Sequence, residues 1–552
     1  MTSSPWNSTE FGSPLPVSVS PSAWVRVCAA FWPLGLVLAV WGSAALYRPP
    51  AVPRHTPADA FSTQRAWRHV EAIARQPHPC GSDANRAVAE YLLAELRSLG
   101  LDVQVHAATA ARGPRSPGVA VRNLVARKPG QANTKAVMLV AHYDSAPLAP
   151  GAADDGAAVA ALLETVRVLH SGPPLRNDLI VLLTDGEELG MLGARAFVAE
   201  HAWLRDVGLV GNFEARGSHG PVFMFETSPG HGRLVAELAR AASPLYATSL
   251  AEPLYRRMPN DTDFSVFREA GLDGFNFAFI AGVEHYHEPS DSPATLDPRS
   301  LYHQGVLALA VARHFGNREL PVPHAADSVY FNVLGPVLAH YPRPWAFPGA
   351  ALLAVSAVAV LWRGRRVGAV RPARAVSGTV VLTVAILLAA GVDLWVAPRL
   401  ARALGDRAAL PLAGAATVLL VAGAYAGLRC KRNAGEASAG VGLWWLLAAV
   451  AAALWLPAGS YLVFWPAALA WAIFPWAARR STLPAVVLTG LPGALALTLF
   501  SPVLHQLTVA FPGSEPLVVW LAAPVLMLAL PALDTLLPAR WTRHGAGSVE
   551  RR

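Results

Sequence analysis

Residues 136–156 read AVMLVAHYDSAPLAPGAADDG and join an apolar run to a polar loop. The first seven residues form a short, apolar run, which predicts a β-strand that is buried on both faces. The run ends at His142 and Asp144, and the loop of small residues that follows carries the tandem pair Asp154 and Asp155. In an open α/β sheet, ligands bind beyond the carboxyl ends of the strands. The polar groups of this stretch therefore stand where a binding site is expected.

Further short apolar runs follow along the chain, and helical patterns separate them. Residues 84–99, 157–170 and 299–315 repeat their apolar residues at helical spacing. This alternation predicts an α/β fold for residues 57–325, with a mostly parallel or mixed central sheet flanked by helices. The expected strands after the first are DLIVLLTD (178–185), VGLVGNF (207–213), PVFMF (221–225) and GFNFAFI (274–280).

Acidic residues and histidines follow several of these expected strands. The second apolar run leads into Glu187 and Glu188, the third ends at Glu214, and the last runs into His285 and His287. Imidazole nitrogen and carboxylate oxygen are ligands that zinc uses, so their convergence at one edge of the sheet predicts a metal centre. The chain contains no HExxH and no GxSxG motif, which argues against a zincin and against an α/β-hydrolase.

Six motifs in this order resemble the di-zinc aminopeptidase family of clan MH, metallopeptidase family M28. They are HYDS (142–145), GAADDG (151–156), DGEELG (185–190), NFEARG (212–217), NDTDF (260–264) and YHEPSD (286–291). The resemblance covers about residues 60–320. The layout of the chain is similar to the membrane-anchored branch of the family, the vacuolar membrane proteases and endoplasmic-reticulum metallopeptidases.

The resemblance implies two zinc ions per chain and five metal ligands. Asp154 would bridge the two ions, and each ion would have two further protein ligands. Asp155 remains an alternative to Asp154, and His287 is preferred to His285 because the family has a tyrosine-histidine pair at this position. The implied ligands are His142, Asp154 and Glu214 for one zinc, and Asp154, Glu188 and His287 for the other.

The same resemblance implies two catalytic residues that are not ligands. Glu187 would be the general base, and Asp144 would accept the ring N–H of His142 and so fix its tautomer. Asp261 and Asp263 could orient substrate or a ligand, or form a turn. His303 is expected on a helix near the rim of the site.

The second half of the chain is strongly apolar. The 552 residues are 53% hydrophobic and 15% charged, and the mean hydropathy is +0.35. The expected organisation is a disordered cytoplasmic tail (1–23), a transmembrane anchor (24–47), the peptidase domain (57–325), a seven-span region (345–538) and a second cytoplasmic tail (539–552). The seven runs, each of about 17 to 21 residues, are 345–362, 376–396, 408–428, 440–460, 462–478, 482–501 and 517–537.

Arginines gather in every second loop between these runs. By the positive-inside rule these loops are cytoplasmic, so the peptidase domain is expected on the opposite side of the membrane, in the periplasm or outside the cell if the source is bacterial. The expected total is about eight spans. Asp393 and Asp534 lie near the ends of their runs and are expected at the membrane interface. The net charge of +8 arises mainly in these loops, so no nucleic-acid partner is expected.

The sequence thus predicts a multi-span membrane protein that acts as a zinc-dependent exopeptidase, an aminopeptidase on peptide substrates. Its partners are the peptide and the lipid bilayer. Two alternatives remain: an acyltransferase similar to glutaminyl cyclases, with one zinc, and a non-catalytic domain of the receptor type. A receptor-like relative would be expected to have lost ligands, and none is lost here.

Overall fold

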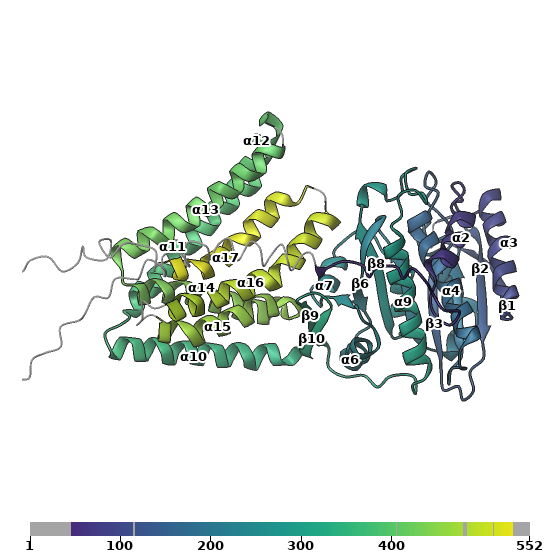
Figure 1. Cartoon of the computed structure of the whole chain (residues 1–552), viewed down its shortest axis with the longest axis horizontal. Coiled ribbons are helices and arrows are strands. Elements are labelled where there is room, and N and C mark those ends of the chain that lie inside the picture. The colour runs from purple at the N-terminus through teal and green to yellow at the C-terminus, as the bar shows by residue number, and fades with distance from the viewer. Residues whose placement is uncertain (1–45, 114–115, 405, 478–482, 512, 534–552) are drawn as a thin grey trace, which may run out of the picture.

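The computed structural model describes residues 46–113, 116–404, 406–477, 483–511 and 513–533. An α/β domain and a bundle of long helices lie end to end (Figure 1). The expected tails (1–23 and 539–552) and all but the last residues of the expected anchor (24–47) lie outside the described residues.

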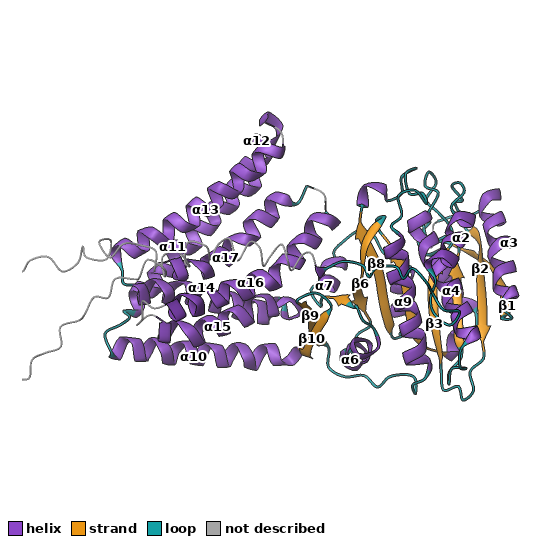
Figure 2. Ribbon diagram, viewed as in Figure 1, coloured by secondary structure: helices purple, strands orange, loops and turns teal. Residues whose placement is uncertain are grey.

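The α/β domain contains a mixed eight-stranded sheet in the order β1-β2-β4-β3-β5-β8-β6-β7. Its centre is parallel, because β3 pairs with β4 and β5, and β5 pairs with β8, all in parallel. Helices flank the sheet (Figure 2). The strands are β1 (Asp102–Ala110), β2 (Val119–Lys128), β3 (Ala136–His142), β4 (Leu179–Thr184), β5 (Val207–Ala215), β6 (His219–Thr227), β7 (Tyr246–Ala247) and β8 (Gly274–Ala281).

The helices of this domain begin and end where their sequences indicate. In α3 the Ser82 hydroxyl accepts the main-chain N–H of Asn85, which caps the first turn, and the apolar face around Leu92 and Leu96 is buried. The three predicted helices are confirmed as α3, α4 and α9. The helices are α2 (Thr63–Ile73), α3 (Asp83–Ser98), α4 (Ala158–Ser171), α5 (Leu192–Glu200), α6 (Gly232–Ala241), α7 (Ala251–Tyr255), α8 (Asp263–Glu269) and α9 (Pro298–Gly316).

All five predicted strands are present, and the expectation of an α/β domain with a mixed sheet is confirmed. The sequence analysis did not predict β1 and β2, which pair antiparallel at one edge of the sheet. In β1 no residue is fully buried, so the strand lacks the apolar run that identifies the central strands.

A two-stranded hairpin of β9 (Ser328–Val333) and β10 (Val337–Pro342) joins the domain to the helical bundle (Figure 1). Within the described residues, six helices are long and apolar enough to cross a membrane, and a shorter apolar helix covers Tyr461–Phe474. The bundle contains α10 (Ala346–Arg366), α11 (Pro372–Gly391), α12 (Ala397–Leu404), α13 (Asp406–Lys431), α14 (Ala434–Trp455), α15 (Tyr461–Ala477), α16 (Leu483–Ala510) and α17 (Glu515–Leu533).

Asp393, which is expected at the membrane interface, lies inside the bundle of helices. It stands in a wide turn, Val392–Val396, that joins α11 to α12, and it is fully buried. One of its oxygens accepts the hydroxyl of Thr417 at 2.6 Å. The neighbouring helix α13 therefore compensates for part of the cost of burying this carboxyl group. The other aspartate, Asp534, lies outside the described residues.

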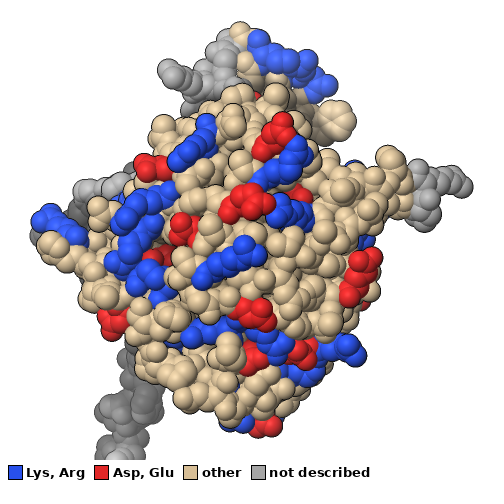
Figure 3. All heavy atoms as spheres, turned by 90° about the vertical axis from the view of Figure 1, so that its right-hand side faces the viewer, with Lys and Arg blue, Asp and Glu red and all other residues tan. Residues whose placement is uncertain are grey.

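The far end of the α/β domain, turned away from the bundle, carries acidic and basic side chains next to one another (Figure 3). A surface that binds nucleic acid usually carries mainly basic side chains. The face in Figure 3 mixes both charges instead.

Candidate metal centre

The seven candidate residues come from separate segments of the chain and meet at one edge of the sheet. His142 ends β3, Glu214 lies near the end of β5, and Asp154 belongs to the loop between β3 and α4. Glu187 and Glu188 lie in the turn after β4. Since β3, β4, β5 and β8 run parallel, their carboxyl ends lie side by side, and this places the polar groups together.

Asp154 stands between the two histidines. Its Oδ1 lies 3.2 Å from Nε2 of His142, and its Oδ2 lies 3.3 Å from Nε2 of His287. The same nitrogen of His287 is 3.1 Å from Oε2 of Glu188, and that of His142 is 3.6 Å from Oε2 of Glu214. The five side chains therefore form two donor sets that share one carboxylate.

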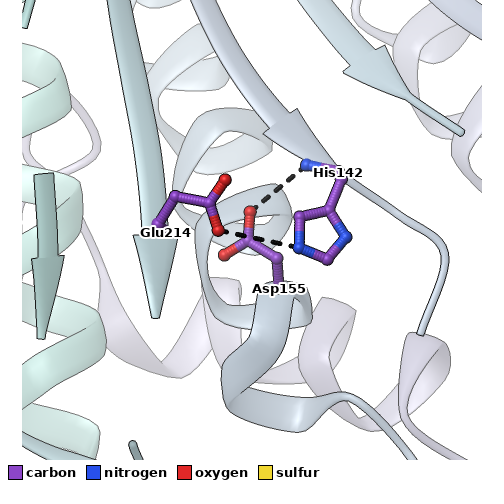
Figure 4. Close-up of side chains that lie close together, drawn as sticks. All are labelled: His142, Asp155 and Glu214. Atoms are coloured by element: carbon purple, nitrogen blue, oxygen red, sulfur yellow. Dashed lines mark hydrogen bonds and ion pairs between the residues drawn. The ribbon is translucent and has the colours of Figure 1, made fainter. Parts of the chain in front are cut away.

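By distance Asp155 also belongs with His142 and Glu214, because ligand atoms of these three residues lie within 4.8 Å of one another (Figure 4). Its Oδ2 accepts the main-chain N–H of His142 at 3.2 Å, so it holds the end of β3. Figure 4 also shows Glu214 directed at the ring nitrogen of His142. Asp154 contacts both imidazole rings, and we therefore prefer Asp154 as the shared group. Oδ1 of Asp155 has no hydrogen-bond partner among the described residues, so Asp155 stays the alternative ligand.

Asp144 supports the turn that carries the two glutamates. Its Oδ1 accepts the N–H of Glu187 at 3.0 Å and its Oδ2 accepts the N–H of Glu188 at 3.3 Å. Nδ1 of His142 lies 2.9 Å from the main-chain oxygen of Asp144 and 3.6 Å from its carboxylate. The ring N–H thus donates to the main-chain oxygen of Asp144 and not, as predicted, to its carboxylate, which instead accepts the N–H groups of the two glutamates.

Asp291 is a further polar group of the site, to which the sequence analysis assigned no role. Its two oxygens accept the main-chain N–H of Ala153 at 2.8 Å and of Asp154 at 3.2 Å. It therefore holds the loop that presents Asp154. The available signal was its place at the end of the motif YHEPSD, but the sequence does not show which loop this side chain reaches.

The electrostatics of the cluster favour a bound cation. Burial and neighbouring charges raise the pKa of the carboxyl groups of Glu187 and Glu214 well above the ordinary value. Burial also acts on Asp154, but its hydrogen bonds to His142 and His287 outweigh burial and lower its pKa. Several buried carboxylates close together repel one another unless positive charge lies between them.

Buried polar atoms without a hydrogen-bond partner also favour a bound cation. Oε1 of Glu188 and Oδ1 of Asp155 are buried and have no hydrogen-bond partner among the described residues. A divalent metal ion would satisfy such groups, and nitrogen and oxygen donors are suitable ligands for zinc. The residues present therefore fit a metal.

The other residues considered from sequence occupy supporting positions. His285 lies in a short 3-10 turn, Val283–His285, and its Nδ1 contacts the hydroxyl of Ser290, so it does not extend a strand toward the site. Asp263 is buried at the start of α8 and accepts the hydroxyl of Thr184 at 2.5 Å. Tyr286 stacks on the ring of His287 with centroids 3.8 Å apart.

His303 is a buried structural residue. Its Nδ1 accepts the N–H of Val222 at 2.9 Å, which leaves the proton on Nε2 to be donated to the oxygen of Pro244 at 3.1 Å. Burial lowers the pKa of this imidazole to about 4. The side chain is therefore a neutral hydrogen-bonded link between α9, β6 and the segment before β7.

The α/β fold thus brings two joined sets of nitrogen and oxygen donors together at the carboxyl ends of its parallel strands. Residues 123–312 match the model of peptidase family M28. The resemblance predicted from the motifs is thereby confirmed.

Named relatives include membrane proteases. The vacuolar membrane protease of Candida albicans is 34% identical over 248 residues, which is 44% of this chain and 29% of that protein. Endoplasmic reticulum metallopeptidase 1 of Mus musculus is 27% identical over 308 residues, 51% of this chain and 34% of that protein. The chain therefore matches about a third of the length of these relatives.

Among solved structures, the aminopeptidase from Aneurinibacillus sp. strain AM-1 is similar over 48% of this chain and 97% of its own, with 15% identity and a TM-score of 0.39. The glutaminyl cyclase of Porphyromonas gingivalis is similar over 45% of this chain and 96% of its own, with 20% identity and a TM-score of 0.39.

Proposed function

We propose that this protein is a membrane-anchored, zinc-dependent exopeptidase that removes amino-terminal residues from peptides. The observation that carries the proposal is the position of Asp154, with one oxygen toward His142 and the other toward His287. A single carboxylate shared by two nitrogen and oxygen donor sets is suited to a pair of metal ions.

The proposed ligands of one zinc are His142, Asp154 and Glu214, and those of the other are Asp154, Glu188 and His287. When bound, two zinc ions would lower the pKa of a water molecule and polarise the scissile carbonyl group. Hydroxide attack on that carbonyl forms the new C–O bond, and loss of the amine breaks the C–N bond.

Glu187 is the proposed proton carrier. Its raised pKa suits a group that takes a proton from the attacking water at its carboxylate and gives it to the nitrogen of the leaving amine. Asp144 holds the main-chain N–H of Glu187 and so positions this carboxylate. Asp291 positions Asp154 in the same manner.

We further propose that the bundle spans the membrane seven times and that the amino-terminal anchor adds one span. The basic loops support an arrangement in which the peptidase domain lies on the non-cytoplasmic side. The six long apolar helices and the shorter one over Tyr461–Phe474 are consistent with seven spans.

The test combines metal analysis with peptide hydrolysis by the full-length protein in detergent. The wild type is expected to hold two zinc ions per chain and to cleave peptides with a free amino terminus but not amino-blocked ones. Glu187→Ala is expected to keep its metal and lose at least ~100-fold in rate, whereas Glu200→Ala, an exposed control, keeps both.

Equal cleavage of free and blocked peptides would contradict aminopeptidase activity, and full rate in Glu187→Ala would contradict the proposed mechanism. One zinc per chain, together with cyclisation of amino-terminal glutamine, would instead favour the cyclase alternative.

A further inference from the structure

A cavity of about 160 Å³ opens beside the metal centre at the junction of the two domains. Asp154, Glu187 and Glu214 line one part of it. The rest of its wall is mainly apolar and comes from both domains. The peptidase domain contributes among others Phe225, Leu254, Tyr255, Met258 and Ile280.

The end of α16 next to the peptidase domain forms the opposite wall. The α16 residues Val503, Gln506, Leu507 and Ala510, together with Phe511 just after the helix, line the same cavity as the catalytic carboxylates. In Figure 1 the bundle meets the peptidase domain at this junction, near α7 and β9. A segment about 300 residues beyond the metal centre in sequence therefore borders the space that a substrate must enter.

Specific contacts hold this wall against the peptidase domain. The guanidinium of Arg216 lies over the ring of Phe511 at 5.9 Å, and Arg216 follows Glu214 by two residues at the end of β5. Elsewhere in the junction the hydroxyls of Thr248 and Tyr461 are 2.8 Å apart, and Phe331 and Tyr461 stack with centroids 4.2 Å apart. The bundle is thus packed against the domain by polar and aromatic contacts of α15, and the contact between Arg216 and Phe511 lies at the end of α16.

We propose that the end of α16 is part of the specificity pocket, so that the membrane bundle selects peptides with a large apolar side chain next to the scissile bond. This inference rests on the proposed peptidase function. The size of the cavity agrees, because apolar cavities of about 150 Å³ accept a benzene ring. Burying a phenylalanine or leucine side chain there favours such substrates over alanine by about 10- to 100-fold.

The cavity also disfavours basic side chains at the cleaved position of a substrate. Arg216 lines the cavity, and its Nε is buried without a hydrogen-bond partner among the described residues. Lysine and arginine side chains of a substrate would lose their hydration in the apolar part of the pocket. Basic residues at the cleaved position are therefore poor substrates.

The experiment measures kcat/KM of the full-length protein in lipid nanodiscs for a peptide series that differs only in the residue before the scissile bond: Ala, Leu, Phe or Lys. Leu507→Trp fills the pocket and is expected to lower the Phe-to-Ala ratio of kcat/KM at least ~10-fold. Leu507→Ala, a milder change, is expected to raise the ratio of Phe to Leu. Leu517→Trp on α17 is the matched control, because its side chain is 36% exposed and lies outside the cavity.

A Phe-to-Ala ratio that stays within twofold of wild type in both Leu507 variants would overturn the inference. An equal change in Leu517→Trp would do the same, because the effect would then not come from the pocket. Binding of the same peptides to Glu187→Gln, read by isothermal calorimetry, separates the two proposals. If the wild type cleaves nothing but binding still prefers Phe in a Leu507-dependent manner, the pocket stands and the peptidase function fails.

Discussion

Exchange of Asp144 for asparagine tests how the site holds its glutamates. The side chain of Asp144 is fully buried, and its two oxygens accept the N–H groups of Glu187 and Glu188. Asparagine keeps the shape but offers one acceptor oxygen and one NH₂ group. One of the two N–H groups then faces another donor and loses its partner.

The expected loss of stability in Asp144→Asn follows from this lost hydrogen bond. A hydrogen bond to a charged group contributes about 1.5–3 kcal/mol, and a buried donor left without a partner costs about 1–3 kcal/mol. We therefore expect Asp144→Asn to lower the free energy of unfolding by about 2–3 kcal/mol. Glu188 is also a proposed ligand, and loss of a group that orients a ligand lowers metal affinity or activity by about 10- to 100-fold.

The assay compares Asp144→Asn with Asp185→Asn in thermal unfolding, zinc affinity and kcat/KM. Asp185 is also buried and accepts the N–H of Arg122 at 3.0 Å and the amide of Asn85 at 3.2 Å, so it contacts no proposed ligand. Both variants are expected to unfold at lower temperature, but only Asp144→Asn loses zinc affinity and rate. Wild-type zinc affinity and rate in Asp144→Asn, with reduced stability, would refute the orienting role.

Three further predictions concern the shared carboxylate, a buried imidazole and the domain junction. Asp154→Asn is expected to lose both metal ions, whereas Asp155→Asn, which retains an oxygen that accepts a main-chain N–H, keeps two per chain; zinc per chain measured by mass spectrometry decides. The lowered pKa of His303, about 4, means that the folded state binds a proton less readily than the unfolded state. The contribution of the neutral His303 to the free energy of unfolding is fully present above pH ~6.5. As the pH falls toward 4, this free energy decreases by up to about 1.4 kcal/mol per pH unit. His303→Gln should remove this part of the pH dependence of the unfolding temperature, and an unchanged slope would contradict it. Tyr461→Phe removes the hydroxyl that forms a hydrogen bond with Thr248 and is expected to lower the free energy of unfolding by about 1 kcal/mol. The same exchange in a Thr248→Val background is expected to lower it by less.

The central strands could be predicted because they are continuous apolar runs bounded by polar residues. Every residue of β3, β4 and β5 is buried. Both faces of these strands therefore carry mostly apolar residues, which gives continuous apolar runs in the sequence. The edge strand β1 was missed for the opposite reason. Every residue of β1 is exposed or partly exposed, and its composition, rich in alanine, does not distinguish a strand from a helix.

The candidate site could be predicted to the level of strand ends but not of side-chain direction. Sequence alone left Asp154 and Asp155 open, because adjacent residues in a loop obey no fixed periodicity. The loop places the Asp154 carboxylate toward the two imidazoles and that of Asp155 toward the main chain. Asp291 was overlooked because its effect depends on reaching a loop 137 residues earlier in the chain, and no local pattern encodes such a contact.

The wall formed by α16 illustrates a stronger limit on inference from sequence. A soluble helix reveals its buried face by the spacing of its apolar residues, because the other face must be polar. A helix that faces lipid is apolar on all sides, so Leu507 next to the metal site and Leu517 at the surface of α17 have the same appearance in the sequence. Gln506 is the one polar residue among those of α16 that line the cavity, and a single glutamine does not define a face. The partner of such a helix is set by the packing of the whole bundle on the α/β domain, and only the folded chain shows that the bundle borders the carboxylates of the candidate site.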